Sequence, residues 1–150
     1  MAHYNHRALD CFNSGMNCAQ AVLAAFSDDL NFDNLLAMQI SSGFGGGMGR
    51  LQGTCGAVTG AFMVLGIYTS GKYSDIDERK DLLNVYIQEL NARFTAIHST
   101  SNCAKLLGID LKTPEGRQTM QDQNLSQRIC CKCISDSVDI LADIIKLPVN

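Results

Sequence analysis

The chain has 150 residues, of which 46% are hydrophobic and 18% charged, and its formal net charge is −3. Acidic and basic residues are interspersed, so no basic patch is available for a nucleic acid, and we expect no nucleic-acid partner. At this length we predict one domain over residues 1–150.

Cysteine content and the first residues suggest a compartment. Seven cysteines are present, and an odd number cannot all pair within one chain. The opening MAHYNHRALDCF lacks the continuous apolar run and the small-residue cleavage site of a signal peptide. These features predict a cytoplasmic protein whose thiols are reduced or bound to a ligand.

The first third of the chain is predicted to form short helices. Two cover residues 3–12 and 17–26 and are broken at Gly15, and a third covers 33–42.

A glycine-rich stretch, GFGGGMGRLQG, follows at residues 43–53. It lacks the Gly-Lys-Ser/Thr of a P-loop, and no predicted strand precedes it, so a nucleotide-binding loop is not supported. We expect instead a tight passage beside a site, with backbone N–H groups available to sulfur or to an anion. Arg50 is interpreted either as an exposed loop residue or as a cation that stabilises thiolates or an anionic ligand. The candidate cofactor-binding residues are Gly47, Arg50, Gly53 and Gly56.

The next segment, TCGAVTGAFMVLGIYTSG at residues 54–71, is uncharged. Its continuously apolar part, about Cys55 to Tyr68, is too short for a typical membrane span, so we expect no membrane partner. Small residues recur every three or four positions, which lets other backbones approach closely. We therefore predict the central buried helix of the domain at about 55–70.

The remaining elements are also predicted to be helical. An amphipathic helix covers 81–97, with a start near Ser74 and Asp77, and apolar residues such as Leu82 and Val85 lie outside its main stripe. Thr113-Pro114 marks another helix start. A final helix includes Ile134 to Ile145 and stops at Pro148. No strand periodicity occurs, so the fold class is predicted as all-α, a bundle-like domain of six to seven helices.

Three cysteines lie where helices are predicted to begin, each after a capping residue: Cys18 after Asn17, Cys55 after Thr54, and Cys103 after Asn102. Free N–H groups and the helix dipole stabilise an anion there, which would lower the pKa of a thiol. The alternative for any one cysteine is a buried, inert small hydrophobe.

A further cluster, Cys130, Cys131 and Cys133, lies in ICCKCIS before the last helix. If the four helix starts converge, four thiolates share one glycine-walled pocket. We expect Cys11 and Cys133 to lie outside it as ordinary hydrophobes. We interpret His98 as a cation at the end of the 81–97 helix.

Several motifs in combination resemble one family. These are GMNCAQAVLAAF, SSGFGGGMGRLQGTCGAVTGAFMVLG with its Cys-Gly-Ala-x-x-Gly at residues 55–60, NCAKLLGID, and a cysteine before the last helix. Together they resemble the C_GCAxxG_C_C family of redox-active proteins. The resemblance covers nearly the whole chain and implies a site of four cysteines, which are Cys18, Cys55, Cys103 and Cys130, with Cys131 as a substitute for Cys130.

Two functions follow as hypotheses. In the first, which we favour, the four thiolates hold an iron–sulfur cluster or zinc, for electron transfer or for structure, because a cation relieves their mutual repulsion. In the second, a metal-free protein forms reversible disulfides. A helical interaction domain with inert cysteines is the remaining alternative. Expected partners are a redox protein and, because symmetric pairs are common, a second copy in a homodimer.

Overall fold

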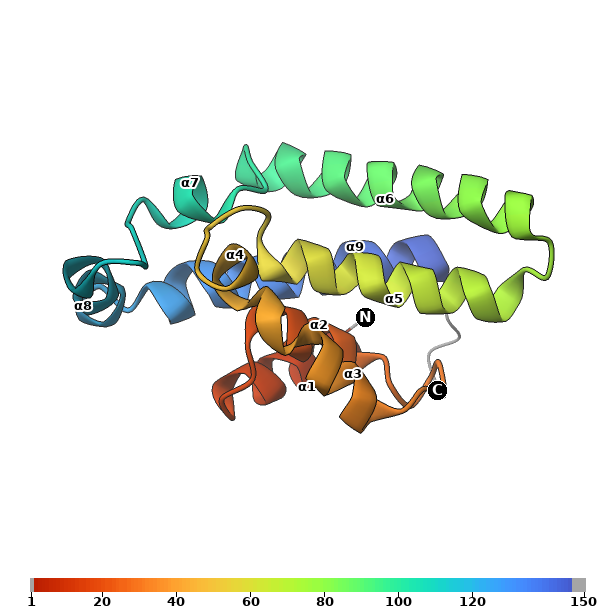
Figure 1. Cartoon of the computed structure of the whole chain (residues 1–150), viewed down its shortest axis with the longest axis horizontal. Helices are drawn as coiled ribbons and strands as arrows, with labels where there is room; N and C mark the ends of the chain where they lie inside the picture. The colour runs from red at the N-terminus through yellow and green to blue at the C-terminus, as the bar shows by residue number, and fades with distance from the viewer. Residues whose placement is uncertain (1, 147–150) are drawn as a thin grey trace.

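The computed structural model describes residues 2–146, and over that range it is all-helical with one isolated β-bridge, between Thr54 and Asn102, as the predicted fold class requires (Figure 1). The segments are α1 Ala2–Asn13, α2 Cys18–Ala25, α3 Asn34–Ser41, η1 Ser42–Phe44, α4 Gly45–Met48, α5 Gly56–Lys72, α6 Ile76–His98, α7 Cys103–Leu107, α8 Pro114–Asp122, η2 Ser126–Cys130 and α9 Cys131–Ile145.

One of these segments, α4, is not a right-handed helix. Gly46, Gly47 and Met48 have φ angles of 63°, 64° and 69°, which make α4 a left-handed turn. Eight right-handed α-helices remain in residues 2–146. The prediction of six to seven is therefore slightly low.

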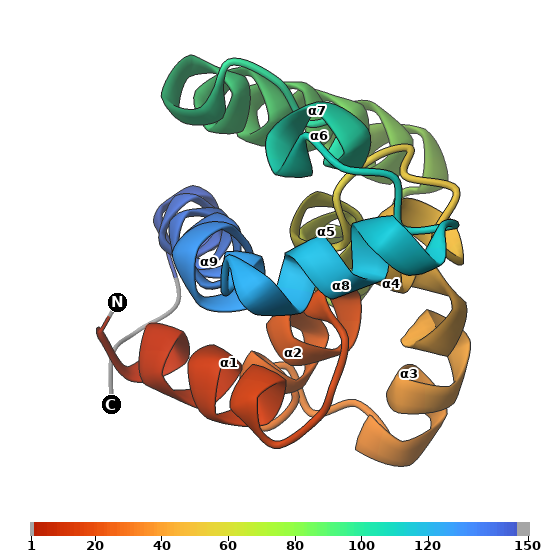
Figure 2. The ribbon, with the colours of Figure 1, turned by 90° about the vertical axis from the view of Figure 1, so that its left-hand side faces the viewer.

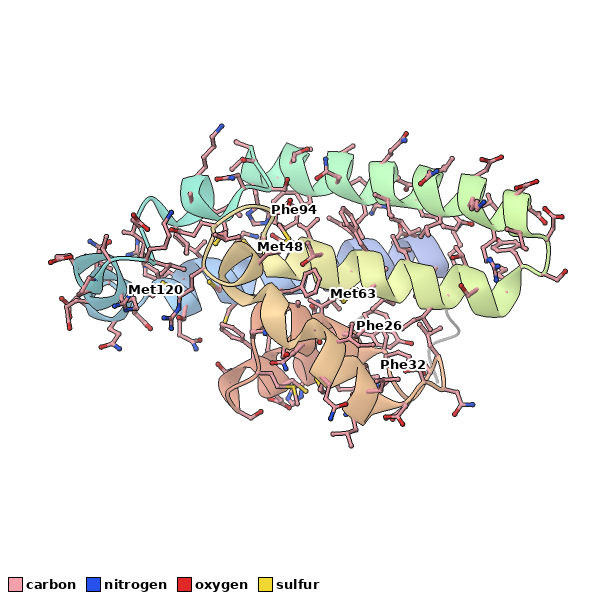
Figure 3. All side chains as sticks on the ribbon, in the orientation of Figure 1. Phe26, Phe32, Met48, Met63, Phe94 and Met120 are labelled. Atoms are coloured by element: carbon pink, nitrogen blue, oxygen red, sulfur yellow. The ribbon has the colours of Figure 1, made fainter. Side chains whose placement is uncertain are left out.

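The long helices α5, α6 and α9 run side by side, while α1, α2 and α3 cover one side of them (Figure 1). The turn α4 and the helices α7 and α8 gather at one end (Figure 2). Phe26 and Phe94, both fully buried, lie on opposite sides of α5 (Figure 3). A smaller cluster of Cys103, Leu107, Leu111 and Leu125 forms under α7 and α8.

Side-chain caps set most helix starts. Asn17 begins α2 with a reciprocal capping box to Gln20, and Asn102 and Thr113 cap α7 and α8. The predicted start of the long helix at Ser74 is wrong, because the Asp75 side chain accepts from the Glu78 N–H and α6 begins at Ile76. The predicted stop at Pro148 lies outside the described residues.

Helix α5 is the central element, and it contacts α2, α6 and α9. No residue from Gly56 to Thr69 is exposed, although α2 buries a larger share of its residues, six of 8 against eight of 17 for α5. Over residues 2–146, no helix combines the length and the apolar character needed to cross a membrane.

Glycine permits the close packing of α5 against α2. A Cβ atom at Gly60 would lie 2.7 Å from the carbonyl oxygen of Ala19 and 2.9 Å from its Cα. These are backbone atoms of a buried helix, so they cannot move aside without shifting α2. By contrast, a Cβ at Gly66 of the same helix would meet nothing within 4 Å.

We expect opposite effects from the same substitution at these two positions. Gly60→Ala should lower the free energy of unfolding by about 1 kcal/mol or more, and Gly60→Leu by more than about 2 kcal/mol, because both overpack the α2–α5 contact. Gly66→Ala should raise it by about 0.5–1 kcal/mol through helix propensity. Urea denaturation followed by circular dichroism measures both, and equal effects at the two positions would contradict the packing.

Candidate functional site

Five cysteine side chains line one cavity of about 700 Å³ at the end of the bundle where α4, α7 and α8 gather (Figure 2). They are Cys18, Cys55, Cys103, Cys130 and Cys133. Cys55, Cys103 and Cys133 are buried, whereas Cys18 and Cys130 are half-buried. The thiols therefore come from four separate parts of the chain and meet in one place.

A short backbone pairing fixes Cys55 beside Cys103. Around the Thr54–Asn102 bridge, the Cys55 N–H donates to the Ser101 carbonyl at 2.7 Å, and the Cys103 N–H donates to the Gly53 carbonyl at 2.7 Å. Each cysteine thus donates its own backbone N–H to the other's segment. The starts of α5 and α7 are held together by this pairing.

The buried Gln52 joins three segments around the same point. Its Nε2 donates to the Ile109 carbonyl at 2.9 Å, and its Oε1 accepts from the Leu111 N–H at 2.8 Å. Its own carbonyl accepts from Asn102 Nδ2 at 3.1 Å. The side chain is 5% exposed, so these bonds satisfy groups that water does not reach.

Two glycines let the cysteines approach the loops. A Cβ at Gly56 would lie 3.0 Å from the Cβ of Cys18, and a Cβ at Gly47 would lie 2.7 Å from the Cβ of Cys103. Any larger residue at either position would displace a cysteine or a loop backbone. The glycine requirement at these positions is therefore one of space.

The loop beside the cavity also has an unusual backbone. Every residue from Gly46 to Arg50 has a φ angle between 60° and 69°, and Gln52 has a φ of 56°. Three of the residues in this region, Met48, Arg50 and Gln52, are not glycine, and each costs roughly 1 kcal/mol in this conformation. Strain of this kind is typical of functional sites and is retained where surrounding contacts enforce it.

The thiols of Cys18 and Cys130 both line the cavity, and each shifts the pKa of the other. Hydrogen bonding with Cys18 lowers the pKa of Cys130, and hydrogen bonding with Cys130, followed by burial, raises the pKa of Cys18. Cys130 is thus the member of the pair that ionises first, and Cys18 is the member that keeps its proton.

The thiols of Cys55 and Cys133 form a second pair. The hydrogen bond from Cys133, supported by the backbone N–H groups of Ala57 and Val58, lowers the pKa of Cys55. The same hydrogen bond, together with burial, raises the pKa of Cys133 far above the ordinary thiol range. Burial, with the nearby Cys55 and Cys130, raises the pKa of Cys103 to about 12.

His98 and Asp136 lie next to Cys133 of the second pair. The Nδ1 atom of His98 lies 4.0 Å from the Cys133 Sγ, and its Nε2 lies 2.9 Å from the Asp136 carboxylate. Nε2 is buried and makes no hydrogen bond of good geometry, although the Asp136 carboxylate is its nearest charged neighbour. The ring stacks on the buried Phe94 with a centroid separation of 4.3 Å.

The placement of cysteines at helix starts is confirmed for two of the positions. Cys18 and Cys103 are the first residues of α2 and α7. Cys55 is instead the N-cap of α5, one position earlier than predicted. Cys130 does not lie at a free helix start, because it is helical and the π turn η2 continues into α9.

The predicted lowering of thiol pKa at the helix starts is wrong for Cys18 and Cys103. Asn17 and Asn102 each accept one of the free backbone N–H groups at these helix starts. The pKa of Cys18 is raised first by its interaction with Cys130 and then by burial, and the pKa of Cys103 is raised first by burial. As an N-cap, Cys55 lies beside the free backbone N–H groups of Ala57 and Val58, which lower its pKa.

The other predicted residues separate into two groups. Gly47, Arg50 and Gly56 line the cavity, whereas Gly53 does not and contributes through its backbone bonds to Gly47 and Cys103. Cys131 is directed to Gln127, at 3.4 Å from its Oε1, and does not line the cavity.

Cys11 and Cys133 were both predicted to lie outside the cavity, and the prediction is correct for only one of them. Cys11 packs against the main core and takes no part in the cavity lining, as expected. The exclusion of Cys133 is wrong, because its side chain lines the cavity and pairs with Cys55. The three-residue spacing between Cys130 and Cys133 was the available signal, since it puts both on nearly the same face of a helix.

His98 and Gln52 were also missed as parts of the site. His98 does end α6, but it faces Cys133 and Asp136, so a role as a simple helix-end cation is an incomplete description. Over residues 2–146, no group of three or more His, Cys, Asp or Glu side chains is arranged to hold a metal ion.

Comparison with protein-family models matches residues 16–144 to a family described as "Putative redox-active protein (C_GCAxxG_C_C)". The match covers both thiol pairs and His98. No curated protein and no solved structure matches the chain.

We expect Gln52→Met to lower the free energy of unfolding by about 2 kcal/mol or more, because it leaves the buried Ile109 carbonyl and Leu111 N–H without partners. Cys103 should also react faster with iodoacetamide as the loops separate. Gln121→Met is the control, because this exposed glutamine lines the same cavity and should change stability by less than about 0.5 kcal/mol. Equal stability of the two variants would contradict the role of Gln52.

Proposed function

Because this chain belongs to the C_GCAxxG_C_C family, we propose that it is a thiol–disulfide redox protein whose cavity brings two dithiol pairs together. The observation that carries the proposal is the meeting of Cys18, Cys130, Cys55 and Cys133 in one cavity. The pKa shifts that Cys18 and Cys130, and Cys55 and Cys133, cause in each other support their assignment as two pairs. In each pair one thiol ionises more readily than its partner. A dithiol that exchanges disulfides needs this asymmetry.

The half-buried pair is the entry point. The Cys130 thiolate attacks one sulfur of a partner disulfide, forms a mixed disulfide and releases the partner's other sulfur as a thiolate. Cys18 then loses its proton and attacks the Cys130 sulfur, which releases the second partner thiolate. The protein gains the Cys18–Cys130 disulfide, and the partner gains two electrons.

The buried pair receives the disulfide in a second exchange. The Cys55 thiolate attacks the Cys18–Cys130 disulfide, and Cys133 then attacks the Cys55 sulfur to complete a Cys55–Cys133 disulfide. Cys18 and Cys130 return to thiols, so no further oxidant is consumed. The negative charges of Cys18, Cys55 and Cys130 influence one another, which supports a short path between the pairs.

His98 supplies the base for this second exchange. The pKa of Cys133 lies far above the ordinary thiol range, so it does not ionise unaided near neutral pH. The Nδ1 atom of His98 faces its sulfur and accepts the proton. The Asp136 carboxylate, 2.9 Å from Nε2, stabilises the positive charge that develops on the ring.

The second candidate is an iron–sulfur cluster or zinc bound by Cys18, Cys55, Cys103 and Cys130, which all face one cavity. Such a centre would supply one-electron transfer or a structural cross-link. The side chains as they stand do not fit a metal, since no suitable group occurs over residues 2–146. They would have to turn toward a common point.

Serine variants separate the roles within the entry pair. After anaerobic reduction and treatment with bis(2-hydroxyethyl) disulfide, mass spectrometry should find the Cys18–Cys130 and Cys55–Cys133 disulfides. Cys130→Ser should slow oxidation about 100-fold, because the readily ionised thiol is lost. Cys18→Ser should retain a mixed disulfide on Cys130, and Cys11→Ser should behave as the unchanged protein. Adducts on Cys131 with Cys130 untouched would contradict the proposal.

Cys103→Ser distinguishes the two candidate functions. Cys103 belongs to neither thiol pair, so thiol exchange predicts that both disulfides still form. A metal centre predicts stoichiometric metal in anaerobically purified protein, with a visible or ultraviolet charge-transfer band, that Cys103→Ser removes. Metal analysis and absorption spectra decide between them.

His98→Gln should slow formation of the Cys55–Cys133 disulfide by roughly 100-fold, the size expected for loss of a general base. The rate at which the Cys18–Cys130 disulfide forms should not change. His6→Gln is the control, since His6 is exposed on α1 and pairs with Asp10. Quenched-flow mass spectrometry measures both disulfides, and equal slowing of both would indicate a structural effect instead.

A further inference from the structure

Apart from the cysteines, the charged side chains that line the cavity are positive. Among residues 2–146, the ionisable residues other than cysteine that line it are Arg50 and Arg117, with no Asp, Glu or Lys. The chain as a whole has a formal net charge of −3, so this lining differs from the rest of the molecule. Thiolates add negative charge to one wall, while the guanidinium groups lie on the loop and on α8.

The two arginines converge on Leu111. Arg117 Nη1 donates to the Leu111 carbonyl at 3.0 Å, which fixes part of its guanidinium group and leaves other N–H donors. The Cγ of Arg50 and the Cδ1 of Leu111 lie 3.1 and 3.6 Å from the point that a Cβ of Gly46 would occupy. Both side chains therefore border the same corner of the cavity.

Neither guanidinium group is neutralised by the protein. In the described part of the chain, Arg50 and Arg117 form no ion pair with a carboxylate, whereas Arg7 and Arg93 each pair with two. Guanidinium groups bind carboxylates in a bidentate manner that lysine cannot reproduce.

The remaining walls are apolar and large enough for a small molecule. Leu106, Leu107, Met120 and Ile129 face the cavity, and its volume of about 700 Å³ falls within the range of ligand pockets. Such walls suit short methylene chains on either side of a disulfide bond. The lining thus offers apolar walls, cationic groups and thiols to one bound molecule.

We propose that the cavity binds a low-molecular-weight disulfide that carries carboxylate groups, with Arg50 and Arg117 as its carboxylate-binding residues. This inference rests on the proposed thiol exchange and names its substrate class. A carboxylate-bearing disulfide would otherwise be repelled by the Cys130 thiolate that attacks it. The two arginines offset that repulsion, and they disfavour a cationic disulfide by like-charge repulsion.

The test compares three disulfides that differ in charge: dianionic 3,3′-dithiodipropionate, neutral bis(2-hydroxyethyl) disulfide and dicationic cystamine. The oxidation rate of the reduced protein by each is divided by the rate of the same disulfide with 2-mercaptoethanol, which removes intrinsic reactivity. We expect the normalised rate for the dianion to exceed that for the neutral compound about 10-fold or more, and the dication to be slowest. The preference should shrink at high salt.

Arginine variants complete the test. Arg50→Gln and Arg117→Gln should each reduce the normalised rate for the dianion several-fold, and the double variant should abolish the preference, while the rate with the neutral disulfide stays unchanged. Arg79→Gln, on α6 and away from the cavity, is the control and should keep the preference. Unchanged neutral rates also show that the variants remain folded.

The outcomes separate the two proposals. Equal normalised rates for all three disulfides, or a preference that survives in the double variant, would overturn carboxylate recognition and leave thiol exchange intact if Cys18–Cys130 still forms. Failure of all three compounds to oxidise any of the paired cysteines would overturn both proposals.

Discussion

The architecture of the cavity depends on a backbone pairing of only a few residues. Helix α5 leaves the cavity, α6 returns to it, and together they separate Cys55 from Cys103 by 48 positions in sequence. The Thr54–Asn102 bridge joins the two ends of this helix pair through reciprocal N–H to carbonyl hydrogen bonds. At 1.5 Å per residue, the outgoing helix is about 26 Å long and the returning one about 35 Å.

Burial and neighbouring thiols, more than the helix dipole, decide which sulfur is reactive. Cys18 and Cys103 occupy helix starts, yet the pKa of Cys18 is raised by its interaction with Cys130 and by burial, and the pKa of Cys103 is raised by burial. Cys130 lies inside continuous helical structure, yet its pKa is lowered by Cys18. Each ionised thiol is stabilised by a partner that keeps its proton. Reactivity in this site is a property of pairs of residues.

Features set by neighbouring residues were predictable from the sequence, and features set by distant contacts were not. The caps Asn17, Asn102 and Thr113 act within one helical turn, so their positions follow from local pattern. The start of α5 moved by one residue because Cys55 donates its N–H across the bridge to Ser101. The family motifs identified four of the five cysteines that meet in the cavity, and the three-residue spacing from Cys130 was a local signal for the fifth, Cys133. The place of His98 required knowledge of how α6 packs on α9, which no single segment encodes.

The left-handed turn has a consequence for the stereochemistry of this protein. From Gly46 to Arg50 the backbone follows the mirror image of an ordinary helical turn, a conformation natural to D-amino acids. At Gly49, with a φ of 60°, the chain uses an achiral residue where a D-residue would fit without strain. A chemically synthesised chain with D-alanine there would keep the turn while restricting the unfolded chain. Part of the wall around the thiols therefore has a left-handed backbone, which is formed by achiral glycines and by strained L-residues.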